Sequence, residues 1–132
     1  MTIETATAHA ESIANQITER VNNDAPFGYV TSHGEHYDTL EEATADGVEE
    51  YEIEEATALD YLEDALDIEY RVNANREYKS AEILVGFGGP NVWIDTKTAT
   101  VNVAWWSETV SRSIPREFTD ALDEALEELF AS

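Results

Sequence analysis

The chain has 132 residues, with 29 Asp and Glu against 7 Lys and Arg, so its formal net charge is −22 at pH 7. Hydrophobic residues make up 42% of the chain and include 3 Trp, 6 Tyr and 4 Phe, which excludes a disordered acidic tail. The length fits a single domain over residues 1–132. The lack of cysteine excludes disulfides, thiolate metal sites and thiol nucleophiles.

The N-terminal sequence has neither the basic region nor the apolar region of a signal peptide. No stretch approaches the ~18 apolar residues that a membrane span needs. We therefore expect a cytoplasmic protein, acting in the cytoplasm of a host cell, with no membrane among its partners.

The first predicted element is an amphipathic helix. Apolar residues recur at steps of three and four between Ile3 and Val21, which places them on one face of a helix. Pro26 lacks a backbone donor and fixes its own backbone angle, so the segment up to it should end the helix. Residues 27–38 are expected to be irregular or weakly extended.

Two further helices are expected in the central acidic segment. Thr39 and Glu42 match the capping box that begins a helix, and this helix should stop at Gly47. Residues 48–53 fit either a helix or a strand. A second helix is expected from about Glu54, with a single apolar stripe. That stripe consists of Leu59, Leu62 and Leu66.

The hydrophobic period then changes from 3.6 to 2, which is typical of half-buried strands. Short connections between the strands predict antiparallel neighbours, and Gly88-Gly89-Pro90 predicts a hairpin turn. The predicted strands cover residues 68–73, 82–87, 92–95 and 100–106.

Pro115 suits the first turn of a C-terminal helix. The buried stripe expected for this helix is Phe118, Leu122, Leu126 and Leu129. The predicted fold is therefore α+β, with an antiparallel sheet of about four strands within residues 67–106. The N-terminal, central acidic and C-terminal helices pack on this sheet.

Three segments carry a resemblance to a known group of proteins. They are LDIEYRV at residues 66–72, ILVGFGGPNVWID at residues 83–95 and the pair Trp105-Trp106. Over roughly residues 59–130, the chain resembles small acidic proteins of phages and integrative mobile elements with an FGGPN(V/I)W-type motif. The resemblance implies a genomic setting. Acidic proteins of this size from phages and mobile elements are often similar in function: they inhibit restriction or CRISPR systems by mimicking DNA.

The negative charge is concentrated in part of the chain. Residues 1–20 carry three acidic residues and one Arg, whereas residues 21–70 carry 16 acidic residues and no Lys or Arg. Residues 71–116 carry six basic and four acidic residues, and residues 117–132 carry six acidic residues. Solubility alone does not require this concentration, so the pattern favours a surface that binds a basic partner.

Residues 41–69 hold 13 carboxylates and no basic residue. If this segment were mostly helical, its charges would recur about every 3.3 Å along the axis, close to the ~3.4 Å of one DNA strand. Carboxylates also bind Arg bidentately, as phosphates do.

We therefore expect a non-enzymatic inhibitor that mimics DNA. It would bind a basic DNA- or RNA-binding protein of a host defence system, such as a nuclease or surveillance complex, and not nucleic acid itself. The expected contact residues are Glu41, Glu42, Asp46, Glu49, Glu50, Glu52, Glu54, Glu55, Asp60, Glu63, Asp64, Asp67 and Trp106.

An alternative is a protein-interaction adaptor that uses the sheet and Trp106, with an acidic face that only keeps the chain soluble. Adaptation to a high-salt host would produce a similar composition. The sequence leaves open which defence system would be the target and whether the chain forms a homodimer.

No catalytic, cofactor-binding or metal-binding residues are expected. His33 and His36 lie near Glu35 and Asp38, but the H-E-x-x-H spacing of a zinc site is absent, so a polar loop is the preferred interpretation. The carboxylates are too numerous for any one pair to be identified as acid–base groups.

Overall fold

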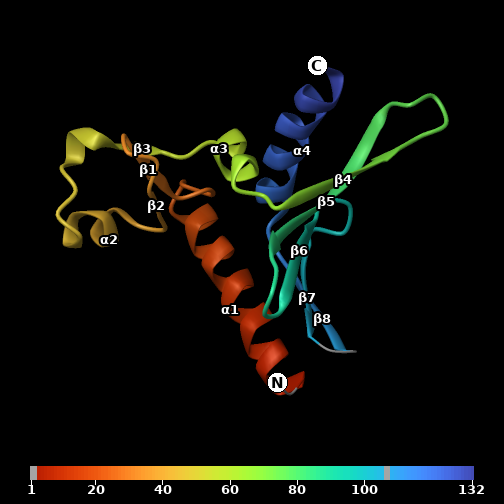
Figure 1. Ribbon diagram of the computed structural model, residues 1–132, viewed down its shortest axis with the longest axis horizontal. Coiled ribbons are helices and arrows are strands. Elements are labelled where there is room, and N and C mark those ends of the chain that lie inside the picture. The colour runs from red at the N-terminus through yellow and green to blue at the C-terminus, as the bar shows by residue number, and fades with distance from the viewer. Residues whose placement is uncertain (1–2, 106–107) are drawn as a thin grey trace.

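The structure is a computed structural model that describes residues 3–105 and 108–132. These residues form an α+β fold with four α-helices and two antiparallel sheets, one of five strands and one of three. Helix α1 (Ile3–Asn22) leads from the larger sheet towards the smaller one (Figure 1). In the described part of the chain, every helix is too short or too polar to cross a membrane.

The larger sheet is a meander with the strand order β4-β5-β6-β7-β8. Its strands are β4 (Asp67–Val72), β5 (Tyr78–Gly86), β6 (Asn91–Asp95), β7 (Thr100–Trp105) and β8 (Glu108–Ser113). The register aligns Ile68, Ile83, Ile94 and Val101 in one row. Helix α1 packs on β7 and β8, and α4 (Arg116–Ala131) packs on β5, so both helices cover the face that carries this row.

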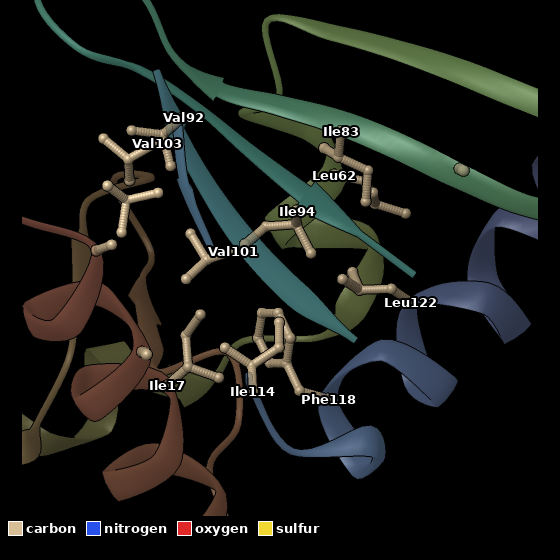
Figure 2. Packing of buried hydrophobic residues seen from close by; sticks show 14 of the residues in the cluster. Ile17, Leu62, Ile83, Val92, Ile94, Val101, Val103, Ile114, Phe118 and Leu122 are labelled. Atoms are coloured by element: carbon tan, nitrogen blue, oxygen red, sulfur yellow. The ribbon is translucent and has the colours of Figure 1, made fainter. Parts of the chain in front are cut away.

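The hydrophobic core lies between these helices and the sheet, as Figure 2 shows. The predicted stripe of α4 is confirmed for three residues, because Phe118, Leu122 and Leu126 are each 0% exposed. It is wrong for Leu129, which lies in the last turn of α4 and is 39% exposed.

About four strands were predicted for the sheet, whereas the larger sheet has five. Strand β8 was missed because it is an edge strand, where only Val110 is a buried apolar residue and its neighbours are polar. A period-2 pattern that contains one apolar residue cannot be distinguished from a loop. Strand β5 also begins at Tyr78, earlier than its predicted start, and the FGGP segment forms the turn to β6.

The second sheet was not predicted. It consists of β1 (Tyr29–Thr31), β2 (His36–Tyr37) and β3 (Ile53–Glu55), in the order β2-β1-β3. Together with α2 (Leu40–Ala45) and the 3-10 turn η1 (Glu50–Glu52), it forms what we call the acidic lobe, residues 29–55. In Figure 1 this lobe lies beyond the C-terminal end of α1, away from the larger sheet. Strands of two or three residues are too short for a sequence pattern to indicate them.

The predicted start and stop of α2 are confirmed. The Thr39 hydroxyl accepts a hydrogen bond from the Glu42 amide at 3.1 Å, which satisfies one of the unpaired amides of the first turn. The helix ends at Ala45, before Gly47, whose φ of +83° is unfavourable for any residue with a Cβ atom.

The second central helix is shorter than predicted. Residues 48–53, left ambiguous, contain η1 and the start of β3, and β3 continues where the helix was expected to begin. Helix α3 (Ala58–Glu63) begins only after Thr57, which forms a capping box with Asp60. Of the predicted stripe, Leu62 is 5% exposed, but Leu59 is 46% and Leu66 is 59% exposed. Leu66 is exposed because the helix has ended before it.

We expect Leu126→Ala to lower the free energy of unfolding by about 2–5 kcal/mol, because its side chain is fully buried and the truncation leaves a cavity. Leu129→Ala is the matched control on the same helix and should cost less than about 1 kcal/mol, because Leu129 is partly exposed. Urea unfolding monitored by circular dichroism measures both. Equal losses would contradict the placement of the core.

Candidate protein-binding surface

Arg20 holds the acidic lobe against α1. It is the only Lys or Arg in residues 1–70. Its Nη1 donates to Asp38 Oδ1 at 2.7 Å, and its Nε donates to the Pro26 carbonyl at 3.1 Å. The Arg20 side chain is 13% exposed and that of Asp38 is 42% exposed, so solvent screens this ion pair only in part.

A second polar contact joins the lobe to α3. His36 Nε2 of β2 lies 3.0 Å from Asp64 Oδ2, at the C-terminal end of α3. Phe27 also contacts Tyr61 of α3 and Phe118 of α4, with ring centroids 5.7 and 5.0 Å apart. Among the described residues, the contacts of Asp38 with Arg20 and of His36 with Asp64 therefore attach side chains of the lobe to α1 and α3, and the aromatic cluster holds Phe27, just before the lobe, against the core.

The condition that residues 41–69 be mostly helical is not met, because strand and turn segments separate short helices there. The structure distributes the predicted contact carboxylates over α2, η1, β3, α3, the turns between these elements, and the start of β4. Glu54 and Glu55 are neighbours on β3, and adjacent residues of a strand point to opposite faces of the sheet. The DNA-like spacing of about 3.3 Å depended on that condition, so the structure gives it no basis.

Three of the predicted carboxylates have partners within the chain. Asp46 accepts a hydrogen bond from the Tyr37 hydroxyl at 3.0 Å, and Asp60 accepts one from the Thr57 amide at 2.8 Å. Asp64 pairs with His36. The hydrogen bonds of the Tyr37 hydroxyl to Glu35 and then to Asp46 raise the pKa of Tyr37. These three carboxylates stabilise the fold locally.

The other nine predicted carboxylates have no side-chain hydrogen bond or ion pair to any residue that the structure describes. All of them are exposed except Glu52, which is partly buried. They are Glu41, Glu42, Glu49, Glu50, Glu52, Glu54, Glu55, Glu63 and Asp67, and we call them the free carboxylates. Seven of the nine lie in the acidic lobe.

Two basic residues of the larger sheet, Arg71 and Arg112, form ion pairs away from the lobe. Arg71 binds Asp95 bidentately, with both Nη···Oδ distances at 2.9 Å, and also lies 3.4 Å from Glu82. Burial raises the pKa of Asp95, but the hydrogen bonds from Arg71 and from two backbone amides outweigh it, so the pKa is lowered. Arg112 pairs with Glu11 at 3.4 Å. Among the described residues, no Lys or Arg pairs with a free carboxylate.

The remaining predicted contact residue, Trp106, lies outside the described residues. Its neighbour Trp105 is partly buried and packs against the core. Within residues 3–105 and 108–132, no group of three or more His, Asp or Glu side chains is arranged to hold a metal ion.

Comparisons of the chain with protein-family models, with curated proteins and with solved structures found no match. The site is therefore interpreted from its own geometry. Sequence reasoning missed Arg20 as the anchor of the lobe, although a single basic residue in the first 70 was a signal that could have identified it.

Replacing Arg20 should loosen the lobe and leave the larger sheet intact. We expect Arg20→Ala to lower the free energy that protects the lobe amides from hydrogen exchange by about 1–2 kcal/mol. The expected loss lies near the lower limit of the ~1.5–3 kcal/mol that a hydrogen bond to a charged group contributes, because Asp38 is partly exposed. The amides of β1 and β3 report on the lobe and those of β6 on the sheet. Arg116→Ala, at an exposed Arg, is the control. Equal loss of protection in β6 would contradict this assignment.

The free carboxylates should not contribute to stability. The combined variant Glu49→Gln, Glu50→Gln and Glu52→Gln removes three charges without removing a side-chain contact. Unfolding free energy should stay the same or rise by up to about 1 kcal/mol, because like charges repel one another. Asp60→Ala should instead lower it by about 0.5–2 kcal/mol through loss of the capping box. Thermal and urea unfolding distinguish the two outcomes.

Proposed function

We propose that the chain is a non-enzymatic inhibitor that binds the cationic nucleic-acid-binding surface of another protein in place of DNA or RNA. The observation that carries the proposal is the set of nine free carboxylates. Seven of them lie on the acidic lobe, and in the part of the chain that the structure describes no Lys or Arg forms an ion pair with any of the nine. By analogy with small acidic proteins of mobile elements, the partner is a nuclease or surveillance complex of a host defence system.

Unpaired surface carboxylates support this function for a physical reason. A carboxylate that already has an intramolecular partner must lose that partner before it can bind a cation, whereas a free carboxylate exchanges only water. Each free carboxylate can therefore form a charge-assisted hydrogen bond with Arg or Lys of the partner. The summed field of the lobe also attracts a basic protein from a distance, so that association is fast and salt-dependent.

The proposal rests on the density and exposure of charge, and not on a regular array of phosphate-like positions. The free carboxylates are held on short elements that face different ways. Such an arrangement suits a groove that contacts the lobe from more than one side. The ion pair between Arg20 and Asp38 keeps the lobe in a fixed position on the core, which lowers the entropic cost of binding.

The direct test uses the basic nucleic-acid-binding protein that the chain retains from a host lysate at low salt. Duplex DNA should compete with the chain for this protein, and binding should weaken steeply as salt is raised. If no such protein is retained, or if DNA and the chain bind it together, the proposal is rejected.

The combined variant Glu49→Gln, Glu50→Gln and Glu52→Gln should weaken binding to that partner by about tenfold or more, at ~0.5–1 kcal/mol for each exposed pair lost. The charge-matched control replaces Glu108, Glu117 and Glu127, which are exposed and lie outside the lobe, by Gln. Calorimetry or surface plasmon resonance measures both variants. Equal effects would favour the alternative in which the acidic surface only keeps the chain soluble.

A further inference from the structure

A shallow groove of about 640 Å³ runs between α4 and the segment that joins β3 to α3. Figure 1 shows α3 beside α4, and the two helices are in contact. The volume lies in the range of ~300–1,000 Å³ that is usual for binding pockets. The groove lies next to the acidic lobe, because Glu55 of β3 forms part of its wall.

The floor of the groove is apolar because α4 presents small side chains there. Phe118, Leu122 and Leu126 of this helix face the core, whereas Ala121 and Ala125 line the groove. Ala121 and Ala125 are four residues apart, and so they lie on the same face of the helix. From the other side, the floor is completed by Pro26, Phe27, Ala56 and Ala58.

The rim of the groove is acidic. Glu55, Glu124 and Glu128 line it, all three are exposed, and none has a side-chain partner among the residues that the structure describes. Leu59 also lines the groove and is 46% exposed. No Lys, Arg or His is among the lining residues. An apolar floor is thus enclosed by carboxylates that lack counter-charges.

We propose that this groove docks an amphipathic basic segment of a protein partner, with apolar side chains on the alanine floor and Lys or Arg side chains at the glutamate rim. The inference rests on the proposed function and specifies how the partner is recognised. Charge complementarity identifies the occupant. Phosphates of nucleic acid or of an anionic lipid would be repelled by the rim, and so would a second copy of this chain, at −22.

A partner that binds here is held by two kinds of interaction with different salt dependence. The contact at the rim weakens as salt is raised, whereas burial of apolar surface on the floor does not. The groove therefore gives the chain a way to select one basic protein from many. A partner with cationic residues alone would leave the floor exposed to water.

The probes for the test are two synthetic peptides of equal length and charge. One has Leu at steps of three and four residues and Lys at the positions between, so that a helix has an apolar face and a basic face, and the other has Ser in place of every Leu. We expect the Leu peptide to bind the wild-type chain about tenfold tighter or more, because even one buried Leu side chain supports that factor. Equal affinities for the two peptides would overturn the proposal.

Variants locate the binding. Ala121→Leu with Ala125→Leu fills the floor with residues that favour a helix. This change should reduce the affinity for the Leu peptide to that for the Ser peptide. Glu124→Gln with Glu128→Gln should weaken binding of both peptides. The control is Leu129→Ser, which changes an exposed Leu of α4 that does not line the groove. Circular dichroism and thermal unfolding establish that each variant is folded.

The outcomes separate this inference from the proposed function. If the variant with Ala121→Leu and Ala125→Leu binds the Leu peptide as tightly as the wild-type chain does, the groove is not the docking site. This conclusion holds even when DNA still competes with the chain for the nucleic-acid-binding protein. If the groove variants weaken peptide binding but the Glu49, Glu50 and Glu52 variant leaves partner binding intact, the docking site stands and DNA mimicry fails. Binding of anionic vesicles or duplex DNA at the groove would also overturn the inference.

Discussion

The position of the acidic lobe depends on the ion pair between Arg20 and Asp38. The first 70 residues contain no other Lys or Arg, and this one guanidinium is mostly buried at the junction of α1 and the lobe. Its contacts with a carboxylate and a backbone carbonyl fix the end of α1 relative to the segment that enters the lobe. A Lys or Arg elsewhere in the lobe would neutralise free carboxylates. The chain thus combines one mostly buried ion pair with an acidic lobe on which seven of the predicted contact carboxylates have no side-chain partner among the described residues.

Concentrated carboxylates destabilise the compact state, because they repel one another in the folded chain more strongly than in an expanded one. The fold tolerates this because its stability has a separate source. The core between α1, α4 and the larger sheet is built from residues such as Ile17, Ile94 and Phe118, which are almost completely buried. The basic residues that pair with carboxylates there, Arg71 and Arg112, stay outside the lobe. The core that stabilises the fold therefore lies outside the acidic lobe, although α4 also carries six acidic residues on its other faces.

The sequence predicted those elements whose residues repeat over a long enough segment. Helices α1 and α4 have apolar stripes of several turns, and β4 to β7 alternate clearly, so the α+β class and most of the larger sheet followed from pattern alone. Edge strand β8 and the three-residue strands of the lobe carry too few apolar residues to form a pattern. The candidate surface was predictable as composition but not as geometry. Only the structure distinguishes Asp60, which caps α3, from Glu50, whose side chain has no partner among the described residues.

The order of synthesis and the order of assembly differ in this fold. The strands of the larger sheet pair with their neighbours in the chain, so each hairpin can form as soon as it is made. Helix α1 packs on β7 and β8, and its Glu11 meets Arg112 across 101 positions of sequence. Helix α1 precedes β7 and β8 in the chain, so it can pack on the larger sheet only after both strands have been synthesised. Until then, the alanine-rich apolar face of α1 has no sheet to pack on.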